Sequence, residues 1–317
     1  AYARQHPGLA LHVAELILPP AEAHVGRARR LLMDAACRRL QASHHPHAFI
    51  ASTDADTCVA PTWLAAIRAE VQAGADAVGG RILTRAANPA CPVRRCQLLD
   101  ATYHVLRSQL EHLLDPDEAD PWPRHHQHFG ASLAVTAAGY RQVGGLPAVP
   151  YLEDEALFRA LRRHDLRVRH SPQVRVYTSD RQQGRVAVGL SWQLREWAGL
   201  LQHGHEPLVD HPAQLISHWQ TRRRLRELWR TTQAGAPVAT QAAGLAAVGP
   251  VAAALLVPPP DLWRQVRQSA SFGELWEWVE AQRQAQLASH GPWPHLPLRA
   301  AVALLRQEIA RLMPAAT

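Results

Sequence analysis

Two aspartates behind a short apolar run are the side chains best suited to chemistry in this chain. Asp54 and Asp56 lie in the segment 52–57, which directly follows the apolar residues 48–51. Side chains two positions apart on an extended segment point to the same side, so both carboxylates can face one hard cation. Mg²⁺ or Mn²⁺ held in this way completes its coordination with water and substrate phosphates. The spacing therefore predicts a divalent-metal site for a nucleotide diphosphate, and the alternative is a solvated aspartate turn at a strand end.

Hydrophobic periodicity predicts that these aspartates end a strand of an α/β domain. The predicted strands cover residues 11–18, 48–52, 77–83, 130–135, 166–170 and 174–177. The predicted helices cover residues 27–41, 61–74, 93–114 and 153–161, with a short one that ends at Gly144. Alternating strands and helices favour a mainly parallel sheet with helices on its faces, in which ligands bind at the carboxyl ends of the strands.

The pattern changes near residue 187, where helices rich in Trp, Leu, Arg and Gln begin and no strand is predicted. We therefore expect two regions, an α/β domain at 1–186 and a helical region at 187–317. The uncharged run 238–257 is as long as a membrane span, but polar residues and the pair Gly249-Pro250 interrupt it. A buried or interfacial helix pair is therefore the preferred interpretation of this run.

The charged residues limit the chemistry and the partners. The 317-residue chain has a formal net charge of +7, and all 34 of its basic residues are arginines. The absence of lysine excludes a Walker-A phosphate loop, a Schiff-base lysine and pyridoxal chemistry. Arginine suits phosphate-bearing partners. The arginines are dispersed over helices, with one compact run at 222–226, so nucleic-acid binding is not expected. A solvated helix face, or contact with acidic lipid headgroups, explains that run.

The cysteines and the first residues bear on the compartment. The chain has four cysteines and no Cys-x-x-Cys pair, which predicts reduced thiols in a cytoplasmic protein, with a peripheral membrane contact as an addition. The segment that starts at Ala1 has no methionine and no targeting signature. We therefore expect the sequence to be a piece of a longer chain.

Four motifs in a fixed order give residues 10–185 a resemblance to family 2 glycosyltransferases. The motifs are Gly26-Arg27-Ala28-Arg29-Arg30, the Asp54-Ala55-Asp56 turn, Gly144-Gly145-Leu146, and Glu153-Asp154 with Leu157 and Leu161. The resemblance implies a GT-A fold with a metal-binding Asp-x-Asp motif and a glycine-rich acceptor segment. The opening strands of the family, which hold the nucleotide base, have no counterpart here. We therefore expect this chain to enter the fold at its third strand.

The resemblance also implies roles for single residues. Asp56 is expected to bind Mg²⁺ or Mn²⁺, with Asp54 on the donor ribose or on the metal through water. Asp154 resembles the catalytic base of the family, which implies inversion at the anomeric carbon. A helix N-terminus favours the ionised carboxylate that a base requires, and the alternative is a plain helix cap. Arg29 resembles the arginine that contacts the donor phosphate.

Two further arginines follow the strand predicted at 174–177. Arg181 and Arg185 stand on a polar loop, and their forked guanidinium groups are suited to close over the diphosphate of a nucleotide-sugar donor. Gln182-x-x-Arg185 resembles the acceptor-end motif of the processive members of the family. Val186 stands where that motif has tryptophan, so processive synthesis is not expected.

Several histidines near these motifs are weaker candidates. His170, at the end of a predicted strand, is an alternative third metal ligand. His125, His126 and His128 precede the predicted strand at 130–135 and are suited to line an acceptor pocket. With 19 histidines in the chain, such clustering arises easily by chance, so none of the four enters the metal prediction.

Three other functions share parts of the pattern. A haloacid-dehalogenase-type phosphatase also uses Asp-x-Asp, but it needs Thr or Val where Cys58 stands, and a lysine that this chain lacks. A sugar-phosphate nucleotidylyltransferase shares the layered α/β plan and the paired carboxylates. A noncatalytic module that binds a sugar or a protein partner stays open as well. The donor nucleotide, the sugar and the acceptor are not predicted.

Overall fold

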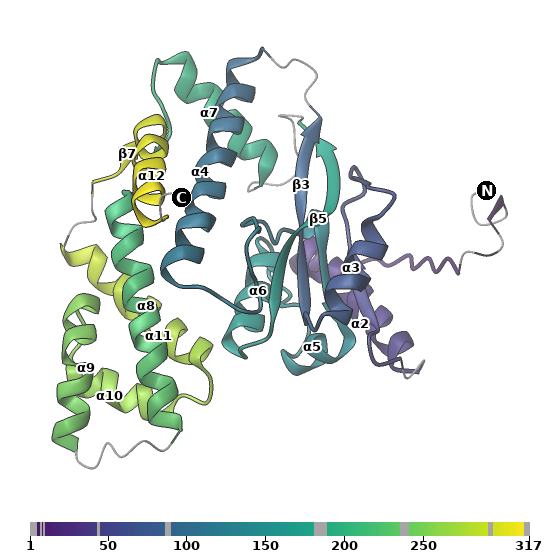
Figure 1. Ribbon diagram of the computed structural model, residues 1–317. Helices are drawn as coiled ribbons and strands as arrows, with labels where there is room; N and C mark the ends of the chain where they lie inside the picture. Colours follow the sequence, from purple (N-terminus) through teal and green to yellow (C-terminus); the bar gives the residue numbers. More distant parts are fainter. Residues whose placement is uncertain are drawn as a thin grey trace.

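A computed structural model gives the fold of the chain (Figure 1). It describes residues 5, 6, 8, 10–42, 45–85, 90–180, 189–234, 241–290 and 294–313, with only the helical backbone for 285–290. Figure 1 shows an α/β part in purple and teal beside a helical part in green and yellow, with the long helix α4 (Pro92–Leu114) between them.

A mixed five-stranded sheet forms the centre of the α/β part. Its strands are β1 (Phe49–Ser52), β2 (Cys58–Val59), β3 (Ala77–Arg85), β4 (Leu133–Thr136) and β5 (Val168–Ser179), in the spatial order β1-β4-β3-β5-β2. β4 is antiparallel to β1 and β3, β2 is antiparallel to β5, and among these strands only β3 and β5 pair in parallel. The chain is α/β as predicted, but the expectation of a mainly parallel sheet is wrong. A parallel return to the sheet needs a crossover that packs on it, whereas α4 packs on the C-terminal helices and the chain returns in the opposite direction.

Alternation along the strands fills both faces of the sheet. Ala77 and Val135 face one buried cluster, whereas their neighbours Val78 and Ala134 face the other. The first face is covered by α2 (Val25–Ala42), α5 (Ala137–Gln142) and α6 (Glu153–Arg163), and the second by α3 (Trp63–Gln72). These helices confirm the predicted ones to within a few residues. A 3₁₀ turn, η2 (Gly130–Ser132), takes the first half of the strand predicted at 130–135.

The N-terminal segment differs from its prediction. Residues 10–19 form no strand, and the side chains of Val13 and Ile17 are 83% and 101% exposed. A short 3₁₀ turn, η1 (Pro20–Glu22), follows before α2. Alternating residues form a stable strand only where a neighbour pairs with their backbone groups, and no described strand pairs with this segment. The predicted strand at 11–18 is therefore wrong for this structure.

The C-terminal part is helical, as predicted, with one small exception. Its helices are α7 (Leu190–Gln202), α8 (Pro212–Gln233), α9 (Gln241–Leu255), α10 (Pro259–Gln268), α11 (Phe272–His290) and α12 (Leu298–Leu312). The exception is a two-residue antiparallel pair of strands, β6 (Leu208–Val209) and β7 (Leu296–Pro297), which the sequence did not predict. Such short strands carry too few residues to show a period.

Buried contacts cross the predicted boundary at residue 186. Tyr103 and Leu110 of α4 belong to one apolar cluster with Trp197 of α7, Trp219 of α8 and residues of α12. At the other end of the interface, the Asp165 carboxylate accepts hydrogen bonds of 2.7 Å from the first two amides of α11. The helical part is thus packed on the α/β part, and the division into two domains stays a prediction.

The uncharged run 238–257 contains all of α9, and its first three residues lie outside the described residues. In the described part of the chain, no helix by itself combines the length and the apolar character that crossing a membrane would need. Among the described helices, the pair α9 and α10 reaches them when taken together, and the axes of the two helices bend by 110° at the break. α9 buries Val248, Ala252 and Leu255 in a cluster with α8, α10 and α11.

Candidate functional site

The turn after β1 presents the two aspartates at the edge of the sheet. β1 pairs with β4 up to Ser52, and Thr53 Oγ1 then donates a hydrogen bond of 2.9 Å to the Ala131 carbonyl in η2. The Asp54 carbonyl accepts a hydrogen bond of 3.1 Å from the Thr57 amide, which closes the turn. The side chain of Asp54 is 43% exposed, and Asp56 is exposed as well. Both carboxylates are therefore open to a ligand from solution.

Arg29 joins this turn to the start of α6. Its Nη2 atom lies 2.7 Å from Asp54 Oδ1, and its Nε atom lies 3.5 Å from Glu153 Oε1. The side chains of Arg29 and Glu153 are only 12% and 6% exposed, so the pair is largely shielded from water. Gly26, three residues earlier in α2, lets the helix pack closely on Val149, because a Cβ there would lie 2.0 Å from the Val149 carbonyl oxygen.

Gly130 connects the same arginine to Asp154. The Gly130 amide donates a hydrogen bond of 2.7 Å to Asp154 Oδ2, and the Glu155 amide donates one of 2.8 Å to Asp154 Oδ1. A Cβ on residue 130 would lie 1.5 Å from Arg29 Nη1, so the guanidinium group occupies the place where a side chain would stand. Asp154 is half-buried in the first turn of α6, and both of its oxygens are held by backbone amides.

Glu153 is an acid of this site that sequence reasoning did not single out. Burial raises the pKa of Glu153, and the carboxylates of Asp154 and Asp54 raise it further, while its own amide and Arg29 lower it. The Arg29 guanidinium group thus pairs with two carboxylates, those of Asp54 and Glu153. The Glu153-Asp154 pair was the feature of the sequence that indicated an acidic helix start, but the side chains of two adjacent helical residues point in different directions. The sequence alone did not indicate that the first one faces Arg29.

The histidines that precede η2 point to different neighbours. His128 Nε2 lies 2.7 Å from Glu155 Oε2, and its ring stacks on Phe158 of α6 with centroids 3.7 Å apart. His126 instead stacks on His104 of α4, at 4.2 Å. His125 contacts the Ser171 carbonyl of β5 at 3.1 Å. Only His128 in this group therefore lies beside the α6 turn that carries Asp154.

His170, the alternative third metal ligand, is directed toward a different acid. Its Nδ1 atom lies 2.7 Å from Asp120 Oδ2, and its amide donates to Asp120 Oδ1 at 2.9 Å. Its ring lies edge-on to His128, 5.7 Å away. Within the described residues, no group of three or more His, Cys, Asp and Glu side chains is arranged to hold a metal ion. The metal prediction therefore rests on Asp54 and Asp56 alone.

The structure brings Arg29, Asp54 and Asp154 together, with Glu153 and Gly130 as additional members. Asp56 lies on the same turn as Asp54. Arg181 and Arg185 lie outside the described residues. Comparisons with models of known protein families, with curated proteins and with solved structures gave no match, so the site is interpreted from its own residues.

Proposed function

We propose that this chain is a metal-dependent glycosyltransferase of the GT-A type, which transfers a sugar from a nucleotide-diphosphate donor to the hydroxyl group of an acceptor. The observation that carries the proposal is the connection of Asp54 to Asp154 through Arg29 and Gly130. Metal-dependent glycosyl transfer needs carboxylates that hold a cation at the leaving diphosphate and a carboxylate base that takes the proton of the acceptor hydroxyl. Here Arg29 and Gly130 lie between Asp54 and Asp154, although the two aspartates are 100 positions apart in the chain.

Asp154 is the proposed base. As the acceptor oxygen attacks the anomeric carbon, its proton passes to the Asp154 carboxylate. The bond from the anomeric carbon to the diphosphate oxygen breaks, and its electron pair leaves with the nucleoside diphosphate. Attack from the face opposite the leaving group inverts the anomeric carbon. The two amide hydrogen bonds fix the carboxylate, and each of its oxygens keeps acceptor capacity for the incoming proton.

Asp54 and Asp56 fit a hard divalent cation, because both offer exposed carboxylate oxygens at a strand end. Asp54 Oδ1 is bound by Arg29, which fixes the side chain. Mg²⁺ or Mn²⁺ on these two residues would supply the charge that neutralises the leaving diphosphate. In this proposal Arg29 orients Asp54. Arg181 and Arg185 are the residues proposed to contact the donor phosphate.

The test measures nucleoside diphosphate release by the full chain with Mn²⁺, a panel of nucleotide sugars and a mixture of simple glycoside acceptors. Asp154→Asn should lower turnover about 100-fold or more, the contribution typical of a positioned base. Asp56→Asn should raise the Mn²⁺ concentration required for half-maximal rate. Glu118→Gln, at an exposed position that is not among the site residues, serves as the control and should change neither quantity.

Unchanged rates in both Asp154→Asn and Asp56→Asn would overturn the proposal. Release of pyrophosphate from a nucleoside triphosphate and a sugar phosphate would indicate nucleotidylyl transfer instead. The two reactions are distinguished by the phosphate product alone, so one chromatographic separation of products decides between them.

A further inference from the structure

Two backbone segments that are distant in the chain hold the Asp154 carboxylate. Its Oδ2 atom accepts a hydrogen bond of 2.7 Å from the Gly130 amide, and its Oδ1 atom accepts one of 2.8 Å from the Glu155 amide. Glu155 belongs to α6 like Asp154 itself, whereas Gly130 lies in η2, before β4. The position of the carboxylate therefore depends on the contacts that keep α6 and the segment 127–130 together.

The segment 127–130 is anchored on β3. The Ile82 amide donates a hydrogen bond of 2.8 Å to Gln127 Oε1, and Gln127 Nε2 donates one of 3.3 Å to the Ile82 carbonyl. Gly79 of the same strand allows a close approach, because a Cβ on it would lie 2.4 Å from the Gln127 carbonyl oxygen and 3.2 Å from His128 Cα. The central sheet therefore fixes one side of this segment.

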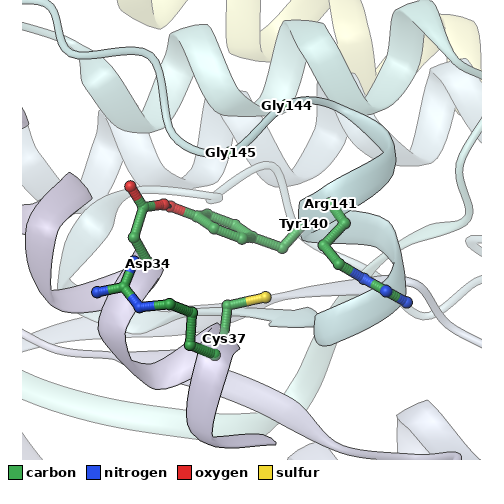
Figure 2. Close-up of a pocket in the computed structure, with 7 residues that line it drawn as sticks. Asp34, Cys37, Tyr140, Arg141, Gly144 and Gly145 are labelled. Atoms are coloured by element: carbon green, nitrogen blue, oxygen red, sulfur yellow. The ribbon is translucent and has the colours of Figure 1, made fainter. Parts of the chain in front are cut away.

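The turn that leads into α6 is anchored on α2 instead. Arg30 of α2 donates from Nη1 to the Leu146 carbonyl at 2.8 Å and from Nη2 to the Gly144 carbonyl at 3.0 Å. In the pocket beside this turn, Tyr140 Oη of α5 donates a hydrogen bond of 2.6 Å to Asp34 Oδ1 of α2, and Figure 2 shows the two side chains pointing toward each other. The two segments that hold the carboxylate thus have different anchors.

His128 joins the two segments directly. Its Nε2 atom lies 2.7 Å from Glu155 Oε2, and its ring stacks on Phe158 of α6 with the centroids 3.7 Å apart and the planes at 6°. The hydrogen bond with His128 lowers the pKa of Glu155 to about 2 against the effect of burial, so the carboxylate is ionised and Nε2 is the donor. Because His128 stands two residues before Gly130 and Glu155 follows Asp154, the pair links both segments next to the proposed base.

We propose that His128 is a positioning residue for Asp154, whose contacts with Glu155 and Phe158 keep the Gly130 amide on the carboxylate. This inference rests on the proposed transferase function, in which Asp154 is the base. A base acts only within hydrogen-bond reach of the proton it takes, and a displacement of about 1 Å can cost about 100-fold in rate. His128 serves this role without contact to either substrate.

The first test is amide hydrogen exchange of the full chain, followed by NMR. His128→Phe keeps a ring that can stack on Phe158 and removes the hydrogen bond to Glu155. The Gly130 amide should exchange at least about tenfold faster in this variant, the factor typical of losing a hydrogen bond to a charged group, while the amides of β4 keep their rates. Arg159→Gln is the matched control. Arg159 pairs with the other oxygen of Glu155 at 3.0 Å, but its side chain is 68% exposed, so its loss should change neither rate.

Glu155→Gln weakens the same contact from the other side. The double variant of His128→Phe and Glu155→Gln should therefore exchange at Gly130 no faster than the faster of the two single variants. Unchanged exchange at Gly130 in both single variants would overturn the proposal. An equal rise in the amides of β4 would overturn it as well, because it would show a general loosening of the fold.

The second test is the rate of nucleoside diphosphate release. His128→Phe should lower kcat at least about tenfold and change the KM values for donor and acceptor less than about twofold, because a base acts in the transition state. A raised acceptor KM with unchanged kcat would make His128 an acceptor contact and would overturn the proposal. If the wild type turns over no nucleotide sugar, the transferase function fails, and the exchange of the Gly130 amide still decides whether His128 positions the carboxylate.

Discussion

Among the residues that the structure describes, Arg29 is the only cation within 4.0 Å of the buried Glu153 carboxylate, and its removal gives the sharpest test of the site. Glu153 has 6% of its side chain exposed, and its Oε1 atom lies 3.5 Å from Arg29 Nε. The carboxylates of Asp54 and Asp154 add to the negative potential there. Arg29→Met keeps much of the apolar stem and removes the charge. Glu153 is then left buried beside two other acids without a cation.

Breaking a buried ion pair by removing one partner costs about 3–5 kcal/mol in the free energy of unfolding. The distance of 3.5 Å is loose for an ion pair, and the Asp54 side of the site is open to water, so we expect about 3 kcal/mol at pH 8. The cost should depend on pH. Burial already raises the pKa of Glu153 and Arg29 opposes this rise, so the variant has a still higher pKa in the folded state.

A carboxyl group whose folded pKa is above its unfolded value of about 4.5 contributes stability that is fully present below that value and is lost as the pH rises through the folded pKa. The deficit of Arg29→Met relative to the wild type should therefore be largest near pH 8. It should shrink when the pH is lowered from 8 to 5.5, because the raised pKa of Glu153 lets the folded variant bind a proton more readily than the unfolded chain. Titrating groups that do not contact Arg29 affect both proteins equally and cancel in the difference.

Urea unfolding followed by tryptophan fluorescence measures this difference for Arg29→Met, Glu153→Gln and the double variant. Glu153→Gln should restore about 2 kcal/mol in the Arg29→Met background, because it removes the unpaired charge. Arg27→Met on the same helix is the control. Its partner Glu22 is 48% exposed, so its loss should cost less than about 1 kcal/mol at either pH. An Arg29→Met deficit equal at both pH values, or additive single changes, would refute the reasoning.

Three further predictions concern other charged groups. Burial lowers the pKa of several histidines, among them His104 to about 4, His125 to about 3 and His126 to about 2. Below pH 6.5 these histidines bind protons in the unfolded chain but not in the folded protein. As the pH is lowered toward 4, each of them should therefore lower the free energy of unfolding by up to about 1.4 kcal/mol per pH unit. Urea midpoints that stay constant from pH 7 to pH 5 would contradict this. Asp115→Asn should destabilise by about 3–5 kcal/mol in the same assay, because the carboxylate is 1% exposed and pairs with Arg222 and Arg226; a change below 1 kcal/mol would show that the pairs contribute little. Gly130→Ala should displace the Arg29 guanidinium and cost about 1–2 kcal/mol, and it should be less than additive with Arg29→Met, whereas full additivity would place the two in separate interactions.

Local pattern predicted the helices, because their backbone hydrogen bonds join residues that are close in the chain. The period of apolar residues at 27–41 predicted α2, which spans Val25–Ala42, and Pro92–Leu114 matches the helix predicted at 93–114. Each of these helices buries one stripe against a cluster, so the period alone carries the information. The strand directions were not predictable in this way, because they depend on where α4 finds its apolar partners. Those partners lie in helices more than 80 residues later.

The segment 11–18 also shows that strands depend on partners elsewhere in the chain. Its alternation is as regular as that of a strand, yet strand formation needs backbone partners, and none of the described strands provides them. Exposed Val13 and Ile17 follow from that lack. A period of two therefore predicts that a segment is suited to a sheet, and the partner decides whether it joins one.

Those members of the candidate site that lie in a recognisable local motif were predictable from the sequence. Asp54 was singled out from its residue type and its position at a strand end, and Asp154 from the resemblance of its motif to that of a known family. Glu153 and Gly130 were not, because their roles follow from the path of the Arg29 side chain across the site. The glycine is required by a guanidinium group about 100 positions earlier. Such a requirement leaves no local signal.

The geometry also explains why the order of the motifs carried more information than any one of them. α2 supplies Arg29, the turn after β1 supplies Asp54, η2 supplies Gly130, and α6 supplies Asp154 and its neighbour. Each contact in the group joins two of these four segments, so the loss of one segment removes contacts from at least one of the others. A solvated aspartate turn would have no need of a buried arginine 25 positions earlier, and a plain helix cap would have no need of the Gly130 amide. The shared contacts therefore favour a site over four unrelated local features.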